Sequence, residues 1–162
     1  MKHPALTTLA LLGLACLGSV VQAAPDDIDR GRYLVSIGGC NDCHTPGYAQ
    51  VGDRIPERDR LTGDTIGFAG PWGVSYPQNL RLGATAADEE TWLARVRAGG
   101  LPPMPWSALQ AMTGQDLRAV YRYLRSLGAA GSAAPAALAP GQAIATPYIS
   151  FEPLPPVTDG AP

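Results

Sequence analysis

The chain has 162 residues, and its twelve Lys and Arg residues against fourteen Asp and Glu residues give a net charge of −2. This length is enough for one domain and too short for two of ordinary size. The nearly balanced charge provides no basic patch for nucleic acid or anionic lipid, so nucleic-acid-binding classes are excluded.

Residues 1–23 have the pattern of a secretory signal peptide. Lys2 gives a polar start, residues 5–21 are almost continuously apolar, and small residues end the segment at Ala23. We therefore expect export to the periplasm and a mature chain without a membrane span. A lipid anchor on Cys16 is an alternative, as is retention of the apolar run as a membrane anchor.

Residues 26–38 are expected to form the first helix. Acidic residues at its start suit the positive end of a helix dipole, and Gly38 and Gly39 mark its end. Gly31 lies in its apolar stripe and permits close approach by another helix. Residues 47–82 then lose both helical and strand periodicity, which predicts long loops organised by a large buried cofactor.

Three further helical segments follow the loops. Thr85 and Asp88 resemble a capping pair, and Thr113 opens the most regular helix of the chain. The expected segments are residues 85–98, 107–112 and 113–127. The apolar face of the last segment repeats at helical spacing through Leu117, Val120, Tyr121, Leu124 and Leu127. No region is rich in strand-forming patterns, so residues 24–128 are predicted to form one helical domain.

Residues 129–162 form a tail rich in Ala and Pro. This composition buries too little apolar surface to offset chain entropy, which predicts a flexible extension. Residues 146–152 differ, because they are aromatic and apolar, and we expect them to dock on the domain as an extended segment.

The most informative motif is Cys-x-x-Cys-His, formed by Cys40, Cys43 and His44. Attachment of a c-type haem needs two thiols that add to its vinyl groups and an imidazole beneath the iron, and this spacing supplies all three. The motif predicts one covalently bound haem c, with His44 as an iron ligand.

A zinc site, a redox-active Cys-x-x-Cys and a structural disulfide are the alternatives. The expected mature chain holds no other Cys or His, so the four ligands of a zinc site are lacking. A redox motif belongs at a strand-to-helix junction, which the pattern does not show. A disulfide leaves His44 without a role.

Elimination narrows the second axial ligand of the iron to two methionines. Cytochromes place His or Met opposite the proximal His, and the mature chain offers only Met104 and Met112. Met104 lies between prolines that fix the backbone, whereas Met112 ends a helical turn, where Met usually fills core space. Met104 is therefore preferred, with Met112 and an open position as alternatives.

Eight residues are candidates for contacts to the haem propionates, although ordinary surface exposure or core packing is the better explanation for each of them. These are Arg54, Arg58, Arg60 and Arg81 of the loop region, and Trp72, Tyr76, Asn79 and Trp106.

These motifs resemble those of the class I c-type cytochromes, and among them the small bacterial proteins with one haem. The resemblance covers residues 30–34, 40–44, 68–73, 102–106 and 113–127. It implies thioether bonds at Cys40 and Cys43. It also implies that His44 is the proximal ligand and Met104 the distal one.

The same resemblance implies an all-α, cytochrome c-like helical domain around the haem, with long loops and an Ala/Pro-rich tail. The first helix is expected to cross the last near Gly31 and Tyr121. The expected function is single-electron transfer, so the chain is not itself an enzyme. Expected partners are a dehydrogenase as donor and an oxidase or another cytochrome as acceptor. The alternative function is a haem enzyme or gas sensor with an open or switchable distal position.

Overall fold

The structure is a computed structural model that describes residues 25–153, 155 and 156. The expected signal peptide, including Cys16, lies outside the described residues. The described helices are α1 (Pro25–Ile37), α2 (Cys40–His44), α3 (Tyr48–Val51), α4 (Leu80–Thr85), α5 (Glu89–Ala98), α6 (Trp106–Ala111) and α7 (Gly114–Ser126). The strands are β1 (Gly67–Gly70), β2 (Gly73–Ser75) and β3 (Tyr148–Ser150). No helix in this part of the chain is both long and apolar enough to span a membrane.

α1 and α7 pack against each other at Gly31, where the structure leaves no room for a side chain. A Cβ on Gly31 would lie 2.1 Å from the Ala119 carbonyl oxygen and 2.7 Å from the Tyr123 Cβ. The helices therefore cross near Gly31 and Tyr121, as expected, with the contact made by Ala119 and Tyr123 on either side of Tyr121. The Tyr121 hydroxyl donates a hydrogen bond of 2.8 Å to the carbonyl of Ala87.

α7 forms the centre of the core, as its sequence predicted. Thr113 caps its first turn by accepting a hydrogen bond of 3.1 Å from the Asp116 amide. Its apolar face is buried with side chains from α1, α4 and α5, which include Leu34, Ala84 and Leu93. Burial of this face is what holds the helices together.

α5 begins later than the sequence indicated. Asp88 alone caps it, accepting a hydrogen bond of 2.8 Å from the Thr91 amide. Thr85 belongs to the end of α4, a short helix that begins inside the region expected to be loop. Asn79 caps α4 by accepting a hydrogen bond of 3.0 Å from the Leu82 amide. Loop residues before it also form α3 and two 3-10 turns, η1 (Gly52–Arg54) and η2 (Glu57–Asp59).

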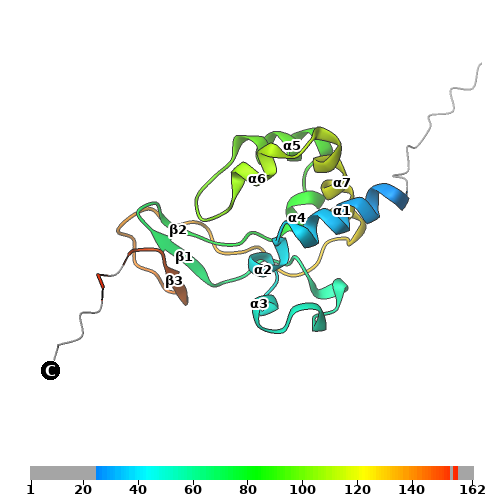
Figure 1. Ribbon diagram of the computed structural model, residues 1–162. Helices are drawn as coiled ribbons and strands as arrows, with labels where there is room; N and C mark the ends of the chain where they lie inside the picture. Colours follow the sequence, from blue (N-terminus) through cyan, green and yellow to red (C-terminus); the bar gives the residue numbers. More distant parts are fainter. Residues whose placement is uncertain (1–24, 154, 157–162) are drawn as a thin grey trace, which may run out of the picture.

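The domain is not purely α-helical, because β1, β2 and β3 form a small sheet at one end of the molecule (Figure 1). β1 pairs antiparallel with β2 and parallel with β3, in the order β2-β1-β3. Gly73 follows the turn of the hairpin with a φ of 94°, which favours glycine. The all-α prediction was wrong in this respect. β1 has four residues, of which two are glycines, and β2 and β3 have three each, so none of them shows an alternating pattern in the sequence.

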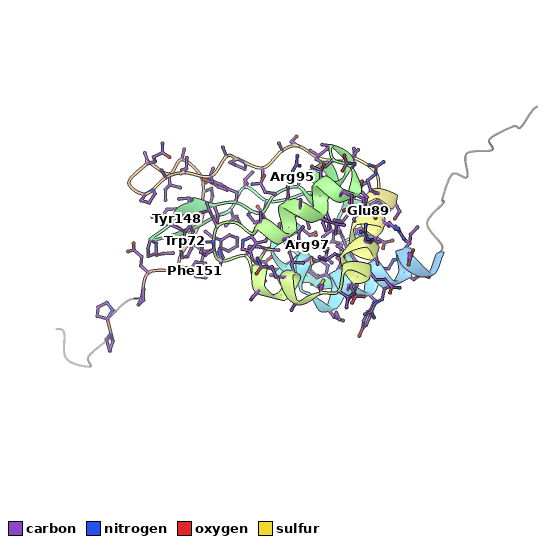
Figure 2. The ribbon with its side chains drawn as sticks, turned by 90° about the horizontal axis from the view of Figure 1, so that it is seen from above. Trp72, Glu89, Arg95, Arg97, Tyr148 and Phe151 are labelled. Atoms are coloured by element: carbon purple, nitrogen blue, oxygen red, sulfur yellow. The ribbon has the colours of Figure 1, made fainter. Side chains whose placement is uncertain are left out.

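The tail lies along the domain over more of its length than residues 146–152. Leu138 and Val74 exchange two backbone hydrogen bonds of 2.9 Å each. Farther on, β3 adds to the hairpin, and Phe151 packs against Phe68 and Trp72 with ring centroids 5.8 Å away in each case. Trp72 and Phe151 lie at the same end of the molecule as Tyr148 (Figure 2).

Candidate functional site

A cavity of about 660 Å³ lies between the motif helix α2, the helices α4 to α6 and the tail. All four residues predicted as sites line it: Cys40, Cys43, His44 and Met104. Most other lining side chains are apolar, including Val35, Trp92, Val96 and Leu124. The fold thus brings Met104, sixty residues after His44 in the chain, into the same cavity as the motif.

His44 is buried and held in one orientation. Its Nδ1 lies 2.7 Å from the carbonyl oxygen of Gln78, which can only accept, so Nδ1 carries the proton and donates. Burial lowers the pKa of His44, and the neutral ring keeps the lone pair on Nε2. A neutral imidazole whose other nitrogen donates to a carbonyl is the usual arrangement of a metal-binding histidine.

The backbone around His44 is fixed by the loop that follows the motif. The Gly63 amide donates a hydrogen bond of 2.9 Å to the His44 carbonyl, and the Leu61 amide donates one of 2.8 Å to the Thr45 hydroxyl. Gly63 has a φ of 80°, and a Cβ there would lie 2.8 Å from the carbonyl oxygen of Pro77. This glycine therefore lets the segment carrying the Gln78 carbonyl approach the histidine.

Cys40 and Cys43 are free thiols, so the structure contains no disulfide between them. Cys40 is half-buried, and desolvation raises the pKa of its thiol to about 11. Cys43 is exposed, and burial of part of its side chain raises its pKa as well. Both thiols are thus protonated at neutral pH, unlike the low-pKa thiolate of a redox-active motif.

The two methionines have different surroundings. Met104 is partly buried and lines the cavity. Met112 does not line it and packs instead against the core formed by α1, α4, α5 and α7. Among the described residues, no group of three or more His, Cys, Asp and Glu side chains could hold a metal ion, which disfavours the zinc alternative.

Among the propionate candidates, Tyr76, Asn79 and Trp106 line the cavity, whereas Trp72 and the four loop arginines do not. Arg81 is buried and donates to the carbonyls of Leu127, Gly128 and Arg58, so it caps the end of α7. The cavity instead receives Arg95 from α5 and, from the tail, three small residues: Ala133, Ala134 and Ala137. Sequence reasoning missed this wall because alanines in a Pro-rich tail give no periodic signal.

The donor set and the cavity fit a covalently attached haem. A volume of about 660 Å³ falls within the range of roughly 300–1,000 Å³ typical of ligand and cofactor pockets. Its walls are apolar, and they hold two thiols, one neutral imidazole and one thioether. These are the groups that c-type haem attachment and axial ligation require.

The chain is similar to a known cytochrome subunit. Over 123 residues it is 31% identical to the gluconate 2-dehydrogenase cytochrome c subunit of Pantoea cypripedii, a match that covers 66% of this chain and 28% of that protein. The chain thus spans less than a third of the relative's length. The similarity suggests a c-type cytochrome, and the relative's name describes an electron-transfer protein rather than an enzyme itself, in agreement with the expectation for this chain. No family model and no solved structure matches the chain.

Proposed function

We propose that the chain is an exported c-type cytochrome with one haem that transfers single electrons. In this proposal Cys40 and Cys43 form the thioether bonds, His44 is the proximal ligand and Met104 the distal one. The observation that carries it is the convergence of these four side chains on one apolar cavity. A covalently bound haem supplies one-electron exchange between ferric and ferrous iron.

The residues around the cavity have separate tasks in this function. The Gln78 carbonyl orients the His44 ring, and the prolines beside Met104 limit the movement of its backbone. Cys43 is exposed, so a group joined to its sulfur reaches the molecular surface, where a redox partner can approach. Apolar walls exclude water from the rest of the site.

The partner class follows from the relative. Because that protein is the cytochrome c subunit of a gluconate dehydrogenase, we infer that this chain accepts electrons from a dehydrogenase. We further infer that it passes them to an oxidase or another cytochrome in the periplasm. A pairing of His with Met suits this direction, since thioether ligation raises the reduction potential.

A pyridine haemochrome spectrum of protein matured in a periplasm tests haem attachment. We expect the spectrum of a haem with two thioether bonds, at one haem per chain. A colourless protein would overturn the proposal. Binding of carbon monoxide by the reduced wild type at neutral pH would show an open iron and favour the gas-sensor alternative.

Met104→Ala tests the distal ligand, with Met112→Ala as the matched control. We expect Met104→Ala to lose the sulfur-to-iron absorption band of the oxidised protein and to bind carbon monoxide when reduced. Met112→Ala should keep the band, because Met112 packs against the core outside the cavity. Retention of the band in Met104→Ala refutes the assignment.

A further inference from the structure

Nearly every arginine side chain of the described residues already has a partner. Arg30, Arg32, Arg118 and Arg122 form hydrogen-bonded ion pairs with carboxylates, and Arg60 forms an ion pair of 3.2 Å with Asp53. Others donate to backbone or tyrosine oxygens or lie close to a carboxylate. Within the part of the chain that the structure describes, only Arg95 and Arg97 make no side-chain hydrogen bond or ion pair.

Arg95 and Arg97 differ in what they face. They are two residues apart in α5, so their side chains leave the helix on different sides (Figure 2). Arg95 lines the cavity, and Arg97 does not. Arg95 is the only Arg, Lys, Asp or Glu side chain among the described residues that line the cavity.

Other polar groups of the cavity wall already have hydrogen-bond partners. The Tyr76 hydroxyl pairs with the Thr146 hydroxyl at 2.8 Å, and the Trp106 indole donates to the Leu101 carbonyl at 3.1 Å. The Asn79 amide donates to the tail carbonyls of Ala130 and Ser132 at 2.8 and 3.1 Å. Arg95 therefore offers the one large set of unused donors at the cavity.

We propose that Arg95 binds a propionate carboxylate of the haem, an inference that rests on the proposed function. A carboxylate placed against apolar walls is costly unless it is paired. A guanidinium meets both oxygens of a carboxylate with two parallel N–H donors, and Arg95 has these donors free. The propionate contact thus comes from α5 rather than from Arg54, Arg58, Arg60 or Arg81, the loop arginines that the sequence suggested.

The pairing has a measurable consequence for the reduction potential. The positive charge of Arg95 keeps the propionate ionised and favours the reduced iron, which carries one positive charge less than the oxidised iron. Without Arg95, the propionate pKa rises toward the experimental pH range. Where the unpaired propionate is still ionised, as at neutral pH, its negative charge favours the oxidised iron, so the potential falls. Protonation of the propionate at lower pH removes that charge and raises the potential again, so the potential depends on pH there.

The test compares Arg95→Gln with Arg97→Gln, which removes the same charge from the same helix outside the cavity. The holoprotein is titrated with redox mediators between pH 5 and 8, and haem content is read from the pyridine haemochrome. At a fixed solution potential near neutral pH, we expect Arg95→Gln to lower the ratio of reduced to oxidised protein severalfold. We also expect the reduction potential of this variant to change with pH within the titrated range. Arg95→Lys should restore part of the ratio, because it keeps the charge but loses the paired donors.

Three outcomes decide the inference. The inference is supported if Arg95→Gln lowers the ratio of reduced to oxidised protein more than Arg97→Gln does, and if only Arg95→Gln makes the reduction potential depend on pH. Equal changes in Arg95→Gln and Arg97→Gln overturn it while leaving the proposed function intact, because only general surface charge is then involved. Absence of haem from the wild type overturns both the inference and the proposed function.

Discussion

Replacing Gly31 by Ala tests whether the crossing of α1 and α7 organises the domain. A Cβ at this position would lie 2.1 Å from the Ala119 carbonyl oxygen, far inside van der Waals contact. That oxygen belongs to the backbone of a helix, so it cannot rotate away as a side chain could. The two helices must therefore separate.

The expected loss of stability follows from two opposing terms. Overpacking of a tight contact costs about 1–3 kcal/mol, and the backbone clash at Gly31 places it at the upper end. Removing a glycine from a helix interior returns roughly 0.5–1 kcal/mol. The net loss in the free energy of unfolding is about 2 kcal/mol, which lowers the midpoint of urea unfolding by about 1 M.

Gly114→Ala serves as the control in urea unfolding of the full mature chain. Gly114 begins α7, and a Cβ there would meet only the Arg97 Nη2 at 3.5 Å, which is an ordinary contact. We expect this variant to match or slightly exceed the wild type in stability. If Gly31→Ala is as stable as Gly114→Ala, the reasoning about the crossing is refuted.

Two further predictions concern docking of the tail and the dependence of stability on pH in the acid range. Asn79→Ala removes the N-cap of α4 and both hydrogen bonds from the Asn79 amide to the tail, so it should lower the free energy of unfolding by about 2–4 kcal/mol. It should also expose the tail alanines to cleavage by elastase. The control Gln110→Ala loses one exposed hydrogen bond and should show neither effect. Hydrogen bonds from Arg32 at 2.7 Å and from Tyr123 at 2.9 Å hold the pKa of Glu57 below its usual value. The ionised Glu57 therefore stabilises the fold fully above its unfolded pKa of about 4.3, and this stabilisation is lost as the pH falls through the lower pKa of the folded state. Unfolding of Glu57→Gln and wild type from pH 3 to 7 should therefore show a stability difference that shrinks at acid pH, and a constant difference would contradict this.

Local signals predicted the helices of the core. α7 has both a capping residue, Thr113, and an uninterrupted apolar face, and its predicted start agrees with the structure. For α5, the sequence indicated a capping pair, Thr85 and Asp88, that would start the helix at Thr85, whereas the structure starts it after Asp88. Only the structure shows that α4 already occupies the first of them.

The parts that sequence could not predict depend on partners distant in the chain. β3 pairs with a hairpin about eighty residues earlier, and the backbone atoms that make this pairing carry no residue-specific signal. Arg95 likewise stands in the sequence as one of two arginines on an amphipathic helix. Its position at the cavity appears only when α5 is packed beside α4, α6 and α7.

The side of the cavity formed by the tail alanines also bears on the order in which the site is completed. The chain is synthesised from its N-terminus, so Cys40 and Cys43 are made about ninety residues before Ala133, Ala134 and Ala137. Until these alanines dock, the cavity lacks one of its walls and is wider on that side. Access to the two thiols is thus greater before the tail docks than after it.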